Sequence, residues 1–265
     1  MDSTSPIPLL QIDAFTSAPF GGNPAAVCRL REPASDAWLL RVAQEMNLSE
    51  TAFLLPEQDG YRLRWFTPAI EVDLCGHATL ASAHALLEWG EWDGCELVRF
   101  YSRSGPLAAR RDGDWIELDF PSRPGQTCAL PAGLEEALGL RAAEAVRFKD
   151  DLLVEVESEA DLRALRPDFQ ALAQLPVRCV TVTARSQAYD FVSRFFAPRM
   201  GVNEDPVTGS SHTRLVPYWS AKLGKTRMLA FQASARGGVL RVELDGDRVR
   251  MAGQAVTVLR GELLA

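Results

Sequence analysis

The sequence predicts an α+β protein built from two similar halves. Its 265 residues are 47% apolar and 24% charged, an ordinary globular composition with enough chain for one large domain or two smaller ones. Most segments read as short strands between turns, but residues 76–90 and 209–224 read as longer helices. The third observation is an internal repeat, in which a motif around the first of these helices returns about half a chain later.

The first half opens with strands. Residues 7–15 read as a strand, the glycine-rich stretch 20–24 as a tight turn and residues 25–28 as a second strand. Asp36 can cap a helix over 37–46, whose apolar residues fall on one side. Further strands are expected at 51–55, 61–66, 96–101, 106–110 and 114–120.

The segment 76–90 is rich in alanine and carries no charge before Glu88. A helix that is apolar on all sides is typical of a protein core, so we expect this helix to be buried. Gly90 is the expected end of the helix, because glycine adopts the left-handed conformation that often follows the last turn.

A proline- and glycine-rich stretch, 121–125, is the best candidate for a domain boundary. We therefore expect an N-terminal domain over 1–122 and a C-terminal domain over 123–265. In the second domain we expect helices near 132–139, 159–173 and 209–224, the last kinked at Pro217, with strands near 145–149, 152–156, 178–184 and 190–196 and a meander over 226–259.

The internal repeat carries charged and apolar residues in the same order twice. The string arginine-aromatic-phenylalanine-x-proline occurs at 64–68 and again at 194–198. In both places an acidic pair and a helix led by glycine follow: Glu71, Asp73 and Gly76 in the first half, and Glu204, Asp205 and Gly209 in the second. The repeat predicts two similar domains that pack as a pseudo-dimer.

Both repeated helices begin with small residues around Gly76 and Gly209. The N–H groups of a first helical turn and the positive end of the helix dipole favour anions, and glycine lets a ligand approach the backbone. If the two starts face one cleft, that cleft would suit a small carboxylate. The alternative is a pair of ordinary capped core helices, and the pattern alone favours neither.

Glu50 lies at the junction between the helix 37–46 and the strand 51–55. A carboxylate sheltered in a dry cleft is a competent general acid or base near neutral pH. A solvated surface position is the commoner fate of a single glutamate, so the sequence alone leaves both interpretations open.

Six motifs follow one another between residues 13 and 224: Asp13-Ala14-Phe15-Thr16, Phe20-x-Gly22-Asn23-Pro24-Ala25-Ala26-Val27, Asn47-Leu48-Ser49-Glu50-Thr51, Arg64-Trp65-Phe66-Thr67-Pro68, Cys75-Gly76-His77-Ala78-Thr79 and Glu204-Asp205-Pro206-Val207-Thr208-Gly209-Ser210. Together, and in this order, they resemble the PhzF family of phenazine-biosynthesis-like isomerases. The resemblance implies the diaminopimelate-epimerase-like fold. In that fold each of two domains is a curved, mostly antiparallel sheet around a central helix, and the active site lies in the cleft between them.

The resemblance also implies a cofactor-free isomerase, usually a homodimer. Its type reaction moves a proton within trans-2,3-dihydro-3-hydroxyanthranilate. Carried over by motif, Glu50 is the acid/base, and His77 and Asp205 complete the catalytic group. Substrate-contacting positions are matched by Ser49, Cys75, Gly76, Gly209 and Ser210, with the region of Gly209 and Ser210 holding the carboxylate and Asp205 the amino group. His77, at a helix start, is expected to have a lowered pKa and to act as a neutral hydrogen-bonding partner.

Cys75 leaves a second reaction open. A thiol at a helix N-terminus can be an activated base, and the related epimerases use two opposed thiols. No cysteine follows Cys179, so two-thiol racemisation is not expected, and a small buried residue is the preferred interpretation of Cys75. The alternatives are an epimerase or racemase using Cys75 and a non-catalytic relative that binds small anions. The substrate does not follow from the motifs.

Charge and residue usage exclude other classes. The net charge of -7 offers no basic field for nucleic acid, and no apolar stretch is long enough to span a bilayer. Residues 1–5 lack the basic and apolar regions of a signal peptide, and the five cysteines form no C-x-x-C pair. We therefore expect a cytoplasmic protein that has no metal site and, since no glycine-rich nucleotide motif follows a strand, no cofactor.

Overall fold

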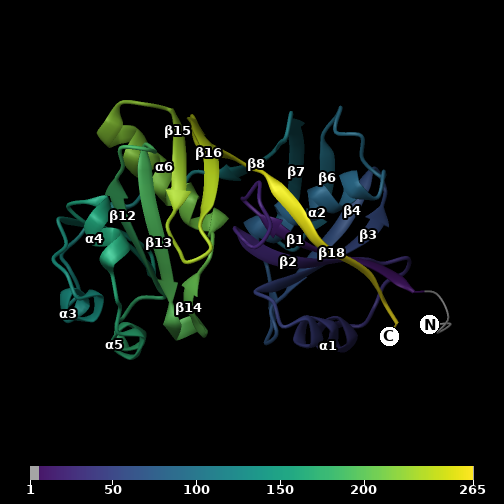
Figure 1. Cartoon of the computed structure of the whole chain (residues 1–265), viewed down its shortest axis with the longest axis horizontal. Coiled ribbons are helices and arrows are strands. Elements are labelled where there is room, and N and C mark those ends of the chain that lie inside the picture. The colour runs from purple at the N-terminus through teal and green to yellow at the C-terminus, as the bar shows by residue number, and fades with distance from the viewer. Residues whose placement is uncertain (1–5, 265) are drawn as a thin grey trace. The chain divides into compact units, whose positions relative to one another are not determined.

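The computed structural model describes residues 6–264, so the polar start that argued against a signal peptide lies outside the described residues. The chain divides into two compact units, Met1–Asp119 with Ala252–Ala265, and Phe120–Met251. The division lies close to the boundary expected at 122. The C-terminal residues, expected in the second domain, belong instead to the first unit, because β18 (Ala255–Leu263) pairs along its length with β1 (Ile7–Ala14) (Figure 1).

The first unit contains the strands β1, β2 (Asn23–Arg29), β3 (Glu50–Glu57), β4 (Gly60–Phe66), β5 (Glu71–Val72), β6 (Val98–Ser102), β7 (Gly105–Asp112) and β18, and the helices α1 (Asp36–Met46) and α2 (Gly76–Glu88). β8 (Trp115–Pro121) leads into the second unit. β2 runs parallel to β3, and β3 antiparallel to β4. β4 is antiparallel to β5 and parallel to β6, which is antiparallel to β7.

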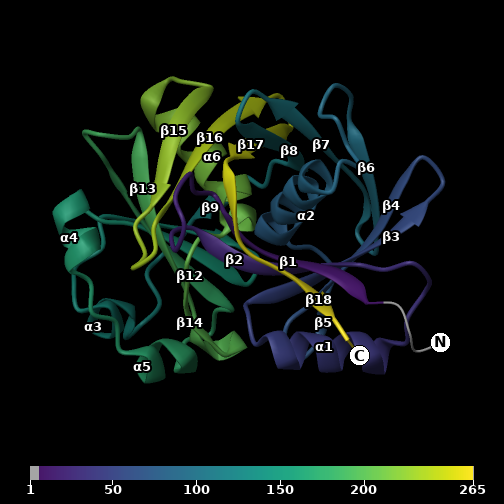
Figure 2. The ribbon, with the colours of Figure 1, turned by 45° about the vertical axis from the view of Figure 1, so that its right-hand side comes forward.

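α2 is the central helix of the first unit. Ten of its 13 residues are buried, which confirms the buried helix expected from its uncharged sequence. It packs against β1, β2, β3 and β18, and Figure 2 shows the strands of this unit around it. The glycine at position 253, outside α2, allows this close packing. A Cβ atom added at Gly253 would lie 2.9 Å from Leu80 on the helix and 2.3 Å from the Phe15 ring.

The second unit contains the strands β9 (Gln126–Thr127), β10 (Glu144–Phe148), β11 (Asp151–Glu155), β12 (Cys179–Arg185), β13 (Phe191–Ala197), β14 (Val202–Asp205), β15 (Arg227–Gln232) and β16 (Gly238–Asp245), and the helices α3 (Leu134–Leu138), α4 (Glu159–Ala164), α5 (Phe169–Gln174) and α6 (Gly209–Leu223). A 3-10 turn spans Pro198–Met200, and β17 (Arg248–Gly253) leads back into the first unit. The protein is therefore α+β, as expected.

The second unit repeats the pairing order of the first. β11 runs parallel to β12, and β12 antiparallel to β13. β13 is antiparallel to β14 and parallel to β15, which is antiparallel to β16. The helix expected over 159–173 is two helices, α4 and α5, since Pro167 between them cannot continue a helix and disfavours helical backbone at the residue before it.

The repeated motifs make the same side-chain contacts in both units. Arg64 binds Glu71 through two hydrogen bonds of 2.7 and 2.6 Å, and Arg194 binds Glu204 through two of 2.8 Å. Each guanidinium also lies 5.0 Å from the ring centre of the phenylalanine two residues on in its own string. The second copy is longer between its proline and its glycine, and the 3-10 turn Pro198–Met200 lies within this extra length. The contacts show that the repeat is structural.

Candidate active site

The first unit brings Glu50 and His77 together. Glu50 is the first residue of β3, and His77 is the second residue of α2. Their Oε2 and Nε2 atoms lie 3.1 Å apart; the His77 side chain is 6% exposed and that of Glu50 18%. The N–H direction does not meet the carboxylate oxygen well, so neither atom has a hydrogen bond of good geometry among the described residues. The pair is sheltered but keeps an opening at the carboxylate.

Asn23 and Cys75 contact the other ring nitrogen of His77. Nδ2 of Asn23 lies 3.2 Å from Nδ1, and Sγ of Cys75 lies 3.5 Å from it. In a neutral ring that accepts from the Asn23 amide at Nδ1, the proton lies on Nε2 and faces Glu50; a protonated ring carries a proton on each nitrogen, and the Asn23 amide then turns its oxygen toward Nδ1. Asn23 lies within one of the family motifs but was not among the predicted site residues. Its place beside the tight turn at Gly22 was the one signal available.

The turn at Gly22 places Asn23. The backbone of Gly22 is left-handed, with φ +59°, and an added Cβ would lie 2.1 Å from the carbonyl oxygen of Ala14. Only glycine fits this approach without a shift of the backbone. β2 therefore begins immediately after the turn, with Asn23 buried as its first residue.

The expectation of a lowered pKa for His77 is wrong. Burial lowers the pKa of His77, but charge and hydrogen-bond interactions with Cys75 and Glu50 raise it, and the result lies well above the ordinary value. Burial, and then the charge of Glu50, raises the pKa of the Cys75 thiol, so Sγ keeps its proton near neutral pH. Where Cys75 keeps its proton, Glu50 is the negative charge beside His77. Cys75 is buried and is not an activated thiolate.

The starts of α2 and α6 share one property. Neither N-cap residue, Cys75 in α2 nor Thr208 in α6, forms a side-chain hydrogen bond to the first turn of its helix. First-turn N–H groups have no acceptor within their own helix. Gly76 and Gly209, the first residues of the two helices, are both buried. This arrangement is compatible with the anion sites expected at both helix starts.

A hydrogen-bond network fixes the loop before α6. Oδ2 of Asp205 accepts a hydrogen bond from the Thr208 hydroxyl. Gln232 on β15 is fully buried; its Oε1 accepts from the backbone N–H of Thr208 at 2.8 Å, and its Nε2 donates to the Asp205 carbonyl at 2.8 Å. Gln232 was missed by the sequence analysis. The only signal was a polar residue at an inward position of an alternating strand.

The predicted site residues form two groups. Glu50, Cys75, Gly76 and His77 come together in the first unit, where Ser49 directly precedes Glu50 and is half-buried. Asp205, Gly209 and Ser210 belong to the second unit, where Ser210 is exposed. That both groups serve one site remains a prediction.

The first unit has a carboxylate, Glu50, at the head of β3, whereas the matching strand of the second unit, β12, begins with Cys179. In both units the arginine-aromatic-phenylalanine strand pairs with the strand before it in the same register, which matches Glu50 with Cys179. Beside Cys179 lies Asp151, whose carboxylate is paired with Arg178 and Arg214. The two units are therefore alike in fold but not in chemistry.

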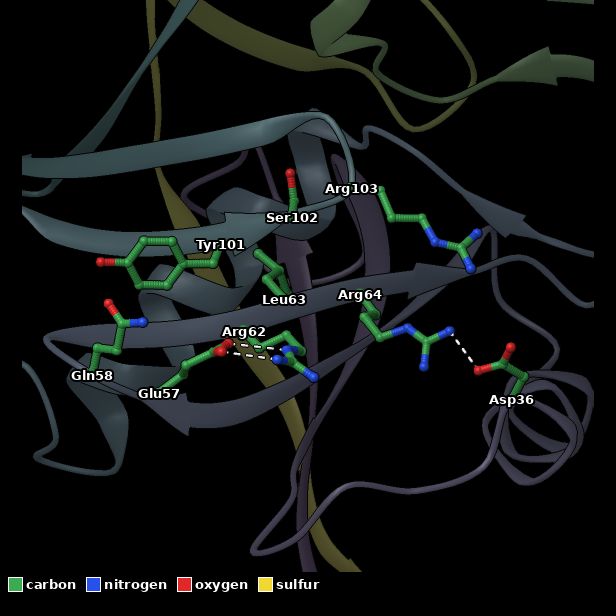
Figure 3. Close-up of a pocket in the computed structure, with 9 residues that line it drawn as sticks. All are labelled: Asp36, Glu57, Gln58, Arg62, Leu63, Arg64, Tyr101, Ser102 and Arg103. Atoms are coloured by element: carbon green, nitrogen blue, oxygen red, sulfur yellow. Dashed lines mark hydrogen bonds and ion pairs between the residues drawn. The ribbon is translucent and has the colours of Figure 1, made fainter.

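A surface pocket of about 510 Å³ in the first unit is a weaker candidate (Figure 3). It is lined by Asp36, Glu57, Gln58, Arg62, Leu63, Arg64, Tyr101, Ser102 and Arg103. Arg62 pairs with Glu57, and Arg64 with Asp36 (Figure 3), while Arg103 pairs with Glu71. Each arginine of the pocket thus already has a carboxylate partner.

No helix among residues 6–264 has the length and apolar character needed to cross a membrane.

Comparisons with known proteins agree with the motifs. The family model described as phenazine biosynthesis-like protein matches residues 12–261. An uncharacterized isomerase of Halalkalibacterium halodurans is 54% identical over 97% of this chain and 98% of its own. One of Pseudomonas aeruginosa is 52% identical over 96% of this chain and 98% of its own. The crystal structure of a PhzF family protein from Enterococcus faecalis has a TM-score of 0.94 and 41% identity, covering 98% of this chain and 99% of that one.

Proposed function

Because the chain belongs to the phenazine biosynthesis-like protein family and is an isomerase of the PhzF type, we propose that Glu50 alone moves a proton between two carbons of its substrate. The substrate in this proposal is a small amino- or hydroxy-carboxylate that resembles trans-2,3-dihydro-3-hydroxyanthranilate. The observation that carries the proposal is the sheltered contact of 3.1 Å between the Glu50 carboxylate and His77.

The carboxylate of Glu50 takes a proton from one carbon and returns it to another on the same face of the substrate. His77, whose pKa is raised chiefly by neighbouring negative charge against the effect of burial, supplies positive charge beside the carboxylate and keeps it oriented between the two transfers. Positioned proton transfer of this kind contributes about 100- to 10,000-fold to a rate. The Glu50 side chain is 18% exposed, so a proton held on its carboxyl group exchanges with solvent before its return, and heavy water labels the substrate.

Substrate binding is assigned to the helix starts. First-turn N–H groups at Gly76 and Gly209 would hold a carboxylate, since neither helix start is capped by its own N-cap side chain. Asp205 would accept a hydrogen bond from the amino group of the substrate, beside the one that its Oδ2 accepts from Thr208. Ser49 and Ser210 are proposed to add hydroxyl contacts.

The epimerase alternative is less favoured. Burial raises the pKa of Cys75, so a thiolate base is scarce near neutral pH. The matching N-cap residue of α6 is Thr208, which offers no second thiol.

Solvent-deuterium incorporation tests the proposal. Metal-free protein in heavy water is incubated with a panel of cyclic and open-chain amino- and hydroxy-carboxylates, and isotope uptake is followed by mass spectrometry. We expect Glu50→Gln to lower the rate by at least about 100-fold while ligand binding persists. Glu57→Gln, at the other end of β3, is the matched control and should keep the rate. Full activity in Glu50→Gln would defeat the proposal.

The cytoplasmic location and the homodimer expected from the family resemblance also belong to this proposal. Sedimentation equilibrium of the purified chain would test the dimer, and a monomer at all concentrations would contradict it.

A further inference from the structure

We propose that Glu50, Cys75 and His77 also form a binding site for a thiophilic divalent cation of the Zn²⁺ class, and that the bound ion blocks proton transfer at Glu50. One ligand atom from each of these side chains lies within 4.8 Å of the other two. The three residues come from the head of β3 and the start of α2, two rigid elements. The metal site itself rests on this geometry, whereas the block rests on the proposed function.

The donor set selects the class of ion. A thiol sulfur, an imidazole nitrogen and a carboxylate oxygen together suit Zn²⁺, whereas Mg²⁺ and Ca²⁺ take oxygen ligands. Bonds of about 2.0–2.3 Å at tetrahedral angles place neighbouring ligand atoms about 3.4–3.6 Å apart. The contact of 3.1 Å between Oε2 of Glu50 and Nε2 of His77 lies close to that spacing, whereas Sγ of Cys75 lies 3.5 Å from the other ring nitrogen, Nδ1.

The two contacts use different nitrogens of His77, and one ion can bind only one of them. An ion at Nε2 keeps the Glu50 carboxylate as its neighbour and leaves Nδ1 to Asn23, whose amide turns to offer its oxygen. Sγ of Cys75 approaches the ion by rotation about its Cα–Cβ bond. As the bond between sulfur and ion forms, the thiol proton passes to the solvent, and a water molecule fills the fourth position.

An independent observation points to an occupant at this place. Oε2 of Glu50 and Nε2 of His77 are buried atoms that face each other at 3.1 Å without a hydrogen bond of good geometry, and neither atom is bonded to another described residue. Buried polar atoms in folded proteins nearly always have a partner. A cation between them would satisfy both atoms, and the partial exposure of Glu50 leaves a path of entry.

Titration with Co²⁺ and Zn²⁺ tests the metal site without any substrate. When Co²⁺ is added to metal-free protein, a cobalt–thiolate charge-transfer band should appear. One equivalent of Zn²⁺ should then abolish the band by displacing the cobalt. Removing a residue that only hydrogen-bonds to a metal ligand typically weakens metal binding about 10- to 100-fold. Cys75→Ser removes a ligand itself, so it should weaken Zn²⁺ binding by at least about 100-fold and remove the band. Cys95→Ser is the matched control, because Cys95 is an exposed thiol of the same unit.

The outcomes separate the metal site from the proposed function. No band in the wild type, or an unchanged band in Cys75→Ser, overturns the metal site whatever the activity. With a substrate from the deuterium panel, one equivalent of Zn²⁺ should stop isotope uptake and a chelator should restore it. Uptake at the full rate with the ion bound through Cys75 overturns the block. If metal-free protein exchanges no compound in the panel, the proposed function fails, and the cobalt band still decides the metal site.

Discussion

Replacement of Gln232 by leucine should destabilise the second unit strongly, although the change keeps the size of the side chain. The variant removes the partners of two backbone groups, the N–H of Thr208 and the carbonyl of Asp205. A buried polar group that loses its partner costs about 1–3 kcal/mol, so two such groups cost about 2–6 kcal/mol. Urea unfolding followed by circular dichroism, at a fixed protein concentration, measures the difference in the free energy of unfolding.

The same variant should loosen the start of α6. Amide hydrogen exchange over residues 205–212 should become faster in Gln232→Leu, since the loop loses its anchor to β15. Gln126→Leu is the matched control, because Gln126 is exposed on β9 and its replacement should change the stability by less than about 0.5 kcal/mol. A loss below about 1 kcal/mol in Gln232→Leu, with unchanged exchange, would refute the role given to Gln232.

Two further predictions concern backbone and pH. Gly22→Ala should destabilise the fold more than Gly246→Ala, in which the left-handed backbone alone costs roughly 1–2 kcal/mol. Of these two positions, Gly22 is the one at which the new Cβ would meet another atom, the carbonyl oxygen of Ala14. Equal melting temperatures for the two variants would contradict the clash. Burial lowers the pKa of His212 from 6.5 to about 4. The pKa of His212 is lower in the folded than in the unfolded state. Its contribution of about 3 kcal/mol to the free energy of unfolding is therefore present above pH 6.5 and is lost as the pH falls through 4. Urea unfolding at pH 7 and pH 4 should show a smaller drop in the free energy of unfolding for His212→Asn than for the wild type. An equal drop in the two proteins would contradict the role given to His212.

Local sequence patterns predicted the parts of the fold that depend on local chemistry. The uncharged run of α2 and the repeated arginine strings correspond to a buried helix and two matching strands. The division into α4 and α5 was missed although Pro167 was visible, because the apolar pattern continues across it. The placement of β18 with β1 was not predictable from local sequence, since no short-range pattern names the partner of a strand.

The candidate site shows the same limit. The motif resemblance selected Glu50 and His77, and the structure places them together. The pKa of His77 is raised by interactions with Cys75 and with Glu50, and Glu50 is distant in sequence, so the helix start alone gave the wrong sign. Asn23 and Gln232 likewise act through partners on other elements, which composition and spacing do not reveal.

The return of the C-terminal strand makes the second unit an insert within the first. A fragment that ends before β18 would strip one edge of β1 of its hydrogen-bonding neighbour, and a bare strand edge recruits other chains into aggregates. Anyone who wishes to express the first unit separately should therefore splice Asp119 to Ala252 through a linker, rather than truncate the gene after the first unit's opening segment.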